Sequence, residues 1–313
     1  MRYDQLAPGI PYVSQIGLGT WQLGDAEDWT AIDDRNAIQL VHHALELGVN
    51  FFDTAPNYGL GTSELRLGKA IADYDRSKIV INSKFGHQVD GQLDFSPEKL
   101  QSSIEGSLTR LKTDYLDSVL LHNPPLAILD GRSCPHYELL DRLKASGKIK
   151  AYGASVDTYE EMMLFMDTSE GALLEVFFNI LHQDTARAFN HALKKNVGII
   201  AKIPLDSGWL TGKYDAKSSF NDIRKRWSKM DIQQRARLIE NVQQILRYPE
   251  SLSQQAISFC CHYKAVATVI PGAYDISQLT QNVESSRVNL SSETIASLEA
   301  FYFNEVKPLN IPW

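Results

Sequence analysis

Short apolar runs alternate with amphipathic segments along the whole chain. Most of the runs are continuously apolar, which is typical of parallel strands that are covered on both faces. The segments between them repeat apolar residues at helical spacing, as where Ala37, Val41 and Ala44 share one stripe and Gly48 comes next as a stop. Eight strands are predicted, at residues 14–19, 49–53, 78–84, 116–122, 148–154, 173–178, 197–202 and 265–270.

The segments between these strands also carry signals for where helices begin. Ser96 precedes Pro97, which places a capping residue before a proline at the first helical position. Leu100, Ile104 and Leu108 then continue one apolar face. Repeat helices are predicted at residues 34–47, 96–111, 137–145, 158–166, 184–195, 252–263 and 277–283, and extra helices at 231–246 and 292–303.

Eight β/α units without a break in composition predict a single domain over residues 1–313. The expected fold is a closed (β/α)8 TIM barrel, with additional helices and a C-terminal tail over the catalytic face. The alternative is an open doubly wound sheet with Gly-x-Gly-x-x-Gly after its first strand. Gly17-Leu18-Gly19-Thr20-Trp21-Gln22 lacks the third glycine, so the barrel is favoured.

The composition is that of an ordinary globular protein, with 43% hydrophobic and 22% charged residues. A net charge of −7 without a basic stripe argues against a nucleic-acid partner. No apolar run is long enough to span a bilayer, so no membrane association is expected. The three cysteines, two of them adjacent, do not form a disulfide framework and predict a reducing, cytoplasmic location. Cys260 and Cys261 are expected to pack as small apolar groups on a helix.

Polar residues close several of the predicted strands. Asp53, Lys84 and His122 end the second, third and fourth strands, and Tyr58 lies shortly after the second. Each residue alone has an ordinary structural interpretation, such as a helix cap, a rim charge or a buried hydrogen-bonding group. In a parallel barrel, however, these ends converge on one mouth. A buried Lys84 without a partner would cost several kcal/mol, so Asp53 is its expected counter-ion.

An ammonium group beside a phenol suggests proton donation. At about 4 Å and an effective dielectric of about 20, Lys84 would lower the pKa of Tyr58 by up to about three units. Tyr58 would then protonate a developing alkoxide while His122 hydrogen-bonds the same oxygen. This predicts carbonyl reduction with a nicotinamide hydride donor. A Schiff-base lyase acting through Lys84 is disfavoured because Asp53 keeps the amine charged. A metal site is not expected, because His42 and His43 lie side by side in a helix.

At these residues the sequence resembles the aldo-keto reductase superfamily. The resemblance implies a (β/α)8 barrel that reduces aldehydes and ketones with NADPH, less often NADH. It also implies a catalytic tetrad of Asp53, Tyr58, Lys84 and His122. The matching motifs include Gly17-Leu18-Gly19-Thr20-Trp21, Phe52-Asp53-Thr54-Ala55, Tyr58-Gly59, Ser83-Lys84-Phe85-Gly86, Leu121-His122-Asn123-Pro124, Gly208-Trp209-Leu210-Thr211-Gly212-Lys213 and Ile270-Pro271-Gly272.

The same resemblance implies how the cofactor is held. NADPH is the expected cofactor, with NADH as the alternative. The implied cofactor-binding residues are Gly19, Thr20, Trp21, Asp53, Ser155, Glu175, Lys202, Leu205, Gly208, Lys213, Gly272, Gln278 and Asn282.

Several positions depart from the family pattern. Val156 replaces an Asn, Glu175 a Gln, and Lys202 an aromatic residue. Because the last two departures occur together, we expect Glu175 and Lys202 to form an ion pair beneath the nicotinamide; the alternative is that Lys202 extends to solvent. Cations that many members use to bind the 2′-phosphate are replaced by Gly272-Ala273-Tyr274 and Gln278, and Lys213, Arg224 or Arg226 would have to compensate.

The substrate is expected to be a small carbonyl compound or a sugar. Trp21, Tyr58, His87 and His122 are the predicted pocket residues, and Trp29, Trp209 and Trp313 are further candidates for its aromatic walls. The alternative to a reductase is a nicotinamide-binding sensor or accessory subunit with little turnover.

Overall fold

The barrel strands lie in chain order. A computed structural model describes residues 1–24, 28–132, 134–247 and 250–312. Eight parallel strands form one sheet in the order β3 to β10, so that each strand lies beside its neighbours in sequence. They are β3 (Leu18–Gly19), β4 (Phe51–Asp53), β5 (Val80–Phe85), β6 (Leu116–His122), β7 (Ile149–Val156), β8 (Leu173–Phe177), β9 (Gly198–Lys202) and β10 (Val266–Val269).

The first and last of these strands meet, which closes the sheet. Parallel bridges join Ile16 to Val269 and Gly19 to Gly272, and the Gly17 amide donates to the Val269 carbonyl at 2.8 Å. A Cβ atom on Gly19 would lie 2.8 Å from the Ile270 carbonyl oxygen, so the close approach depends on glycine. The predicted (β/α)8 barrel is confirmed, and the open sheet is excluded.

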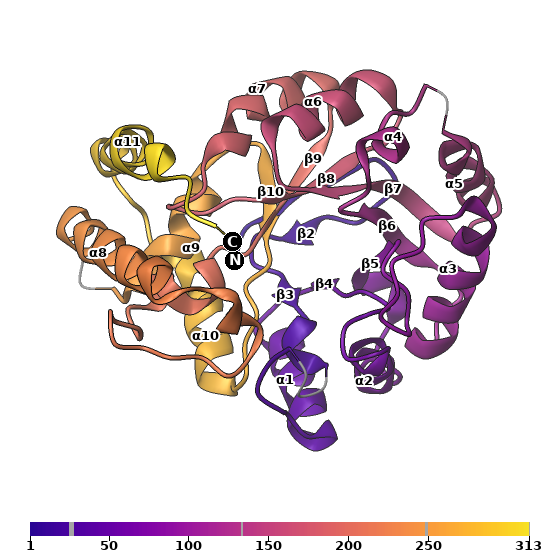
Figure 1. The fold of residues 1–313 in the computed structure, drawn as a ribbon. Helices are drawn as coiled ribbons and strands as arrows, with labels where there is room; N and C mark the ends of the chain where they lie inside the picture. Colours follow the sequence, from indigo (N-terminus) through magenta and orange to yellow (C-terminus); the bar gives the residue numbers. More distant parts are fainter. Residues whose placement is uncertain (25–27, 133, 248–249, 313) are drawn as a thin grey trace.

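Helices surround the strands, as Figure 1 shows. Side-chain caps fix several of their first turns: the Asp33 carboxylate accepts from the Asn36 amide, and Ser228 and Ser251 form capping boxes. The helices are α1 (Asp34–Glu46), α2 (Thr62–Ala70), α3 (Pro97–Leu111), α4 (Leu126–Leu129), α5 (Pro135–Ala145), α6 (Tyr159–Thr168), α7 (Phe189–Lys195), α8 (Lys229–Ile245), α9 (Leu252–His262), α10 (Ile276–Glu284) and α11 (Ser292–Phe301).

Several elements differ from the sequence-based expectation, including two helices. Helix α2 was not predicted, because its buried face includes Ser63, Glu64 and Gly68 and does not form an apolar stripe. The predicted helix at 184–195 is divided into a 3-10 helix, Asp184–Ala188, and α7.

The predicted strand at 14–19 is also divided. Its beginning forms β2 (Val13–Ser14), which pairs antiparallel with β1 (Tyr3–Asp4), and its end forms β3. The segment between β1 and β2 packs Leu6 and Ile10 into a second apolar cluster together with residues of several barrel strands. A Cβ atom on Gly198, the first residue of β9, would lie 1.9 Å from the Leu6 carbonyl oxygen. The N-terminal segment therefore covers the end of the barrel where the strands begin.

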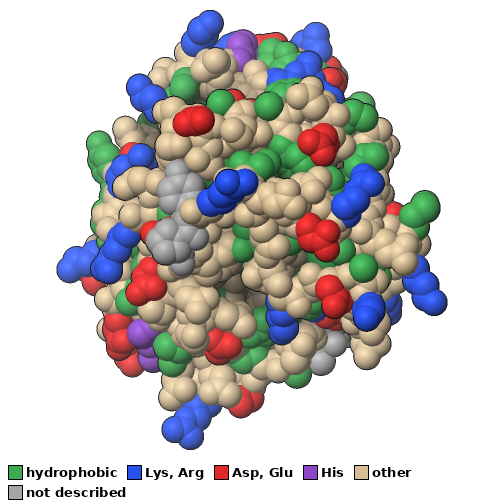
Figure 2. Space-filling view, turned by 90° about the vertical axis from the view of Figure 1, so that its left-hand side faces the viewer, with side chains coloured by type: hydrophobic (Ala, Val, Ile, Leu, Met, Phe, Trp, Pro, Cys, Tyr) green, Lys and Arg blue, Asp and Glu red, His purple; other side chains and the backbone are tan. Residues whose placement is uncertain are grey.

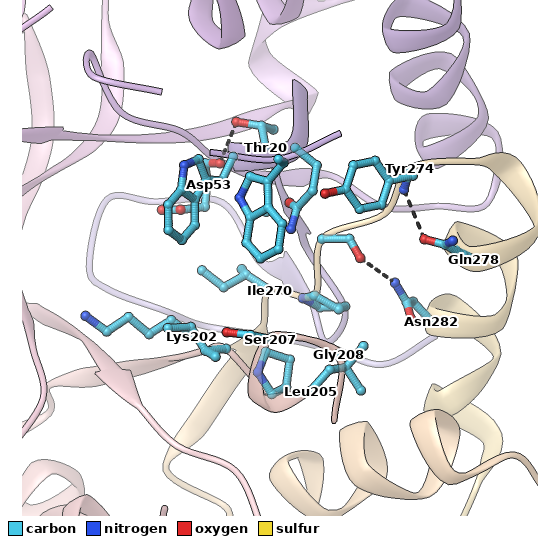
Figure 3. Close-up of a pocket in the computed structure, with 18 of the residues that line it drawn as sticks. Thr20, Asp53, Lys202, Leu205, Ser207, Gly208, Ile270, Tyr274, Gln278 and Asn282 are labelled. Atoms are coloured by element: carbon cyan, nitrogen blue, oxygen red, sulfur yellow. Dashed lines mark hydrogen bonds between the residues drawn. The ribbon is translucent and has the colours of Figure 1, made fainter. Parts of the chain in front are cut away.

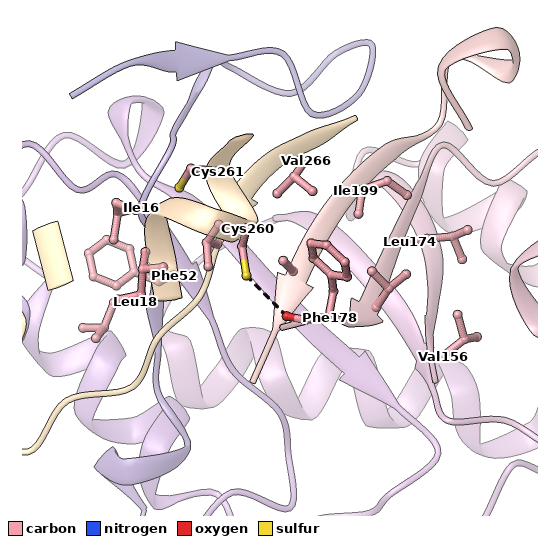
Figure 4. Close-up of a cluster of buried hydrophobic side chains, with 14 of the residues drawn as sticks. Ile16, Leu18, Phe52, Val156, Leu174, Phe178, Ile199, Cys260, Cys261 and Val266 are labelled. Carbon is pink, nitrogen blue, oxygen red and sulfur yellow. Dashed lines mark hydrogen bonds between the residues drawn. The ribbon is translucent and has the colours of Figure 1, made fainter. Parts of the chain in front are cut away.

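The larger apolar cluster lies between the strands and the helices (Figure 4). Cys260 and Cys261 of α9 are buried and free, and the Cys260 thiol donates to the Phe178 carbonyl at 3.5 Å. Their predicted role as small packing groups is confirmed.

The extra helix α8 anchors the C-terminal tail. Arg235 of α8 is fully buried; its Nε lies 3.2 Å from the Asp206 carboxylate, and it donates to the Pro312 carbonyl. Asp206 belongs to the loop after β9, so the tail is tied to the end of the barrel where the strands finish. Trp313 lies outside the described residues.

The surface beside these helices carries charges of both signs. Figure 2 views the side of the molecule with α8, α10 and α11, where acidic and basic side chains are interspersed. None of the helices in the described ranges has the length and hydrophobicity that a bilayer crossing requires.

Two glycines differ in how much space their surroundings leave for a side chain. A Cβ atom on Gly153 of β7 would lie 1.8 Å from the Leu173 carbonyl oxygen, whereas one on Gly106 of α3 would meet first the end of the Arg110 side chain, at 3.1 Å. We therefore expect Gly153→Ala to lower the free energy of unfolding by about 3 kcal/mol. The matched Gly106→Ala should change it by no more than about 1 kcal/mol. Chemical denaturation measures both values, and equal stability of the two variants would contradict this account of the packing.

Candidate active site

The four predicted tetrad residues meet at the end of the barrel where the strands finish. Asp53 ends β4, Lys84 lies near the end of β5, His122 ends β6 and Tyr58 lies in the loop after β4. The Lys84 ammonium lies 2.5 Å from a carboxylate oxygen of Asp53 and 3.3 Å from the Tyr58 hydroxyl oxygen. Asp53 is thus the counter-ion of Lys84, as predicted. Lys84 is only 2% exposed, so its charge depends on protein partners and not on water.

Polar groups behind Asp53 hold this ion pair in place. The Asn82 side-chain amide of β5 donates to the second Asp53 oxygen at 2.6 Å, and its own oxygen accepts from Ser118 of β6 at 2.6 Å. Lys84 also donates to the Thr54 carbonyl at 3.1 Å. The direction of the ammonium group is therefore fixed by three adjacent strands.

A second buried carboxylate reaches the same ammonium. Glu175 of β8 places its Oε2 atom 3.5 Å from the Lys84 Nζ atom. Its Oε1 atom accepts a hydrogen bond from the Ser155 hydroxyl at 3.1 Å. Lys84 is consequently shared between Asp53 and Glu175.

The predicted ion pair between Glu175 and Lys202 does not form. Lys202 instead lies 2.8 Å from a carboxylate oxygen of Asp157 and donates to the Ser155 hydroxyl at 2.9 Å. The strand register explains this difference: Lys202 lies opposite Phe177 on β8, whereas Glu175 lies one layer deeper. Two separate ion pairs are thus joined through Ser155. The alternative, a Lys202 that extends freely to solvent, does not hold either.

Burial and the charges of neighbouring groups together shift the pKa values of Lys84, Tyr58 and Asp53. Burial disfavours the charged form of Lys84, but the carboxylates of Asp53 and Glu175 outweigh it and raise the pKa of Lys84. Burial also raises the pKa of Tyr58, and the nearby carboxylates add to this effect, so that the attraction of Lys84 is overcome. The expectation that Lys84 lowers the pKa of Tyr58 below its usual value is therefore wrong for the protein without a bound ligand. Burial, followed by the repulsion of Glu175, raises the pKa of Asp53.

His122 is held as a neutral imidazole. Burial, followed by the charge of Lys84, lowers the pKa of His122 well below its usual value. Its ring lies edge-on to Tyr58, with 6.1 Å between the centroids, and 4.4 Å from the ring of His87. The Nδ1 atom has no hydrogen-bond partner among the described residues. A neutral ring of this kind can hydrogen-bond a ligand oxygen without adding a positive charge.

A cavity of about 630 Å³ opens at these residues. Figure 3 shows Asp53 and Lys202 toward one end, and Tyr274, Gln278 and Asn282 toward the other. The volume is within the range of cofactor and ligand pockets. The predicted site residues that line the cavity are Gly19, Thr20, Trp21, Asp53, Tyr58, His87, His122, Glu175, Lys202, Leu205, Gly208, Lys213, Gly272, Gln278 and Asn282.

Two of the predicted site residues do not line the cavity but contact residues that do. Ser155 and Lys84 are buried and act on the lining residues that they contact. Trp29 lines the cavity, but Trp209 is fully buried away from it and packs against Tyr214 and other aromatic rings. Trp209 is therefore a packing residue and not part of a pocket wall.

Hydrogen bonds connect the residues at the far end of the cavity. The Gln278 side chain accepts from the Tyr274 amide at 3.1 Å, and Asn282 donates to the Gly272 carbonyl at 3.1 Å. The Tyr274 hydroxyl is buried without a hydrogen-bond partner among the described residues. Gly208 has a φ of 97°, so its turn brings backbone to the cavity where a side chain would be strained. An elongated cavity with these polar groups fits a dinucleotide.

Besides Lys202, two further cations, Arg224 and Lys213, line the cavity. Arg224 pairs with Asp222 and lies over the ring of Trp29, while Lys213 is exposed. Arg226 does not line the cavity. Of the three cations considered for a 2′-phosphate, Lys213 and Arg224 are therefore placed at the cavity.

Sequence analysis missed the residues that hold Lys202. Asn123 accepts from the Lys202 ammonium at 3.1 Å and donates to Asp157 at 2.6 Å. Its position directly after His122, at the end of a predicted strand, was a signal for a role at the mouth. Asp157 had no such signal, because it comes after the last residue of β7 in an ordinary helix-entry sequence.

Comparison with known proteins identifies the family. The profile of the aldo/keto reductase family matches residues 15–302. The chain belongs to this family. Aldo/keto reductases are oxidoreductases that act on carbonyl compounds and use nicotinamide cofactors.

Individual aldo/keto reductases resemble the chain over most of its length. NADH-specific methylglyoxal reductase of Escherichia coli is 26% identical over 89% of this chain and 91% of its own length. L-galactose dehydrogenase of Arabidopsis thaliana is 27% identical over 96% of this chain and 93% of its own. The structure of glycerol dehydrogenase from Gluconobacter oxydans has a TM-score of 0.82 at 25% identity, with 98% of this chain and 97% of that chain covered.

The neutral state of His122 can be tested directly. Because burial and Lys84 lower its pKa, the ring should show no protonation between pH 8 and pH 6.5. Histidine-labelled protein and the His122→Asn variant, compared by NMR, identify its signals. A titration of these signals with a midpoint at or above about 6.5 would contradict the assignment of a neutral ring. Because the unfolded chain takes up this proton at higher pH than the folded one, His122 should also cost stability as the pH falls below about 6.5.

Proposed function

We propose that the protein is a nicotinamide-dependent oxidoreductase that reduces an aldehyde or ketone to an alcohol, with Tyr58 as the proton donor. One observation supports this most strongly. The Tyr58 hydroxyl lines a cavity of dinucleotide size and lies 3.3 Å from an ammonium group whose position is fixed by Asp53. This arrangement supports Tyr58 as the proton donor and Lys84 as the group that stabilises the resulting anion.

The residues around the cavity have different roles in the proposed reaction. The substrate carbonyl oxygen lies between the Tyr58 hydroxyl and the His122 ring, where it receives two hydrogen bonds. Tyr58 is protonated at neutral pH, because burial raises its pKa, and it is therefore ready to donate. Lys84 stabilises the phenolate that remains after the proton has left. A bound nicotinamide supplies the hydride.

The cofactor is held along the rest of the cavity. Trp21 and Lys202 would hold the nicotinamide of a bound cofactor, and Gly272, Gln278 and Asn282 would hold its adenosine. We propose NADPH as cofactor, because Lys213 and Arg224 line the cavity and are available to its phosphate groups. NADH is the alternative, because the residues from Gly272 to Asn282 that line the cavity include no Lys or Arg.

The substrate is proposed to be a small polar carbonyl compound or a sugar. The relatives above are named for methylglyoxal, L-galactose and glycerol, all of which are small and rich in oxygen. Their names, one reductase and two dehydrogenases, give no support to the alternative of a sensor or accessory subunit. We further propose that residues 1–313 act as a single domain; a cytoplasmic location stays a prediction.

Replacement of the proposed proton donor should separate catalysis from binding. Tyr58→Phe removes the hydroxyl and keeps the ring that stacks on Trp21, with centroids 5.6 Å apart. We expect kcat for carbonyl reduction to fall by about a thousandfold or more, while the Kd of NADPH and NADH changes by less than about threefold. Loss of absorbance at 340 nm with a panel of small aldehydes and sugars measures the first, and a fluorescence titration the second.

Two results would overturn the proposal. Full activity in Tyr58→Phe would mean that another group donates the proton. A parent protein that binds NAD(P)H tightly but turns over none of the carbonyl compounds would point to the sensor instead.

A further inference from the structure

Two buried carboxyl groups share the single ammonium group of Lys84. Asp53 and Glu175 both contact its ammonium group, at 2.5 Å and 3.5 Å. Both carboxylates are 2% exposed, so water screens them poorly. The Glu175 Oε2 atom has no hydrogen-bond partner among the described residues. The other cation in reach, Lys202, forms its ion pair with Asp157.

The proposed function brings a second cation to this position. For hydride transfer, the donor carbon of the nicotinamide must lie within about 3.5 Å of the reacting carbon, whose oxygen is hydrogen-bonded to Tyr58. Tyr58 and Glu175 contact the same ammonium and line the same cavity. These links would place the nicotinamide ring on the order of 10 Å from Glu175. The ring carries one positive charge when it is oxidised and none when it is reduced.

We propose that Glu175 discriminates between the two redox states of the cofactor, holding the oxidised form more tightly than the reduced form. This inference rests on the proposed function, because only a hydride-transfer site places the ring beside this carboxylate. At about 10 Å and an effective dielectric of about 20, one buried charge changes the relative affinity by about tenfold. Tighter binding of the oxidised form makes the bound reduced cofactor a stronger hydride donor, so Glu175 would favour carbonyl reduction at the hydride-transfer step.

The preference should increase with pH. Two carboxyls that share one ammonium do not ionise independently, and the pKa of Asp53 is raised by burial and by Glu175. At neutral pH the pair retains part of a proton, which an incoming cationic ring must displace. Because the pKa of Asp53 is raised to about 8, the pair is more fully ionised at pH 9 than at pH 7, and the discrimination is larger there. The other titratable groups around Glu175 and its partners are Lys84, Tyr58, Lys202, His122 and His87.

Two variants separate the charge of Glu175 from its structural role. Glu175→Gln keeps the size of the side chain and an oxygen that can accept from Ser155, but removes the charge. Glu175→Asp keeps the charge with a shorter side chain. The Kd values of NAD⁺, NADH, NADP⁺ and NADPH are measured for each protein by fluorescence titration and calorimetry, at pH 7 and pH 9, without a carbonyl substrate.

The expected result is a change in the ratio of affinities. In Glu175→Gln the preference for the oxidised cofactor over the reduced one should fall by about tenfold at pH 9, and by less at pH 7. In Glu175→Asp the ratio should stay within about threefold of the parent. Should the glutamine variant fail to fold, the aspartate variant and the pH dependence of NAD⁺ binding to the parent decide the matter: affinity for NAD⁺ must rise relative to NADH between pH 7 and pH 9.

Other outcomes would overturn the inference in distinguishable ways. If all forms bind but the ratio in Glu175→Gln equals that of the parent, Glu175 is only a structural partner of Lys84 and Ser155. If the parent binds none of the four dinucleotides, the proposed function fails as well.

Discussion

The site depends on the burial of one ammonium group between two carboxylates. Lys84 is kept from water, so the strength of its contacts with Asp53, Glu175 and Tyr58 is set by the protein and not by solvent. An unpaired ammonium here would be strongly destabilising, and an unpaired carboxylate equally so. In the proposed reaction the buried Lys84 also stabilises the anion of the neighbouring phenol, while the two carboxylates oppose its formation. Stability and chemistry therefore rest on the same contacts.

The barrel provides this arrangement by bringing distant parts of the sequence together. Asp53, Lys84 and Glu175 come from β4, β5 and β8, and the cavity continues to residues of α10. Each side chain needs only to stand near the end of its strand, because parallel strands in a closed sheet place all these ends at one face. Glycine is required where β3 and the chain after β10 approach most closely, as at Gly19.

Strand order was enough to predict the convergence of Asp53, Tyr58, Lys84 and His122, because parallel strands finish at one face of a barrel. Prediction failed where the contacts of a side chain depend on its level along the barrel axis or on how deeply it is buried. The partner of Glu175 was missed, because adjacent strands suggest Lys202, whereas the register places the two in different layers. The direction of the Tyr58 pKa depends on how deeply the hydroxyl is buried, which the sequence does not state. Helix α2 was missed because polar residues and glycine occupy part of its buried face.

The cover at the opposite end of the barrel has a consequence for how protons move. The N-terminal segment up to β2 fills that end with apolar side chains such as Leu6, Ile10 and Val13, and apolar side chains offer no hydrogen-bonding groups along which a proton could travel. In the proposed reaction, Tyr58 would therefore regain its proton from the side of the cavity mouth. A product or cofactor bound in the mouth would block this path for protons. Release of the product and reprotonation of Tyr58 would then be coupled by the shape of the barrel.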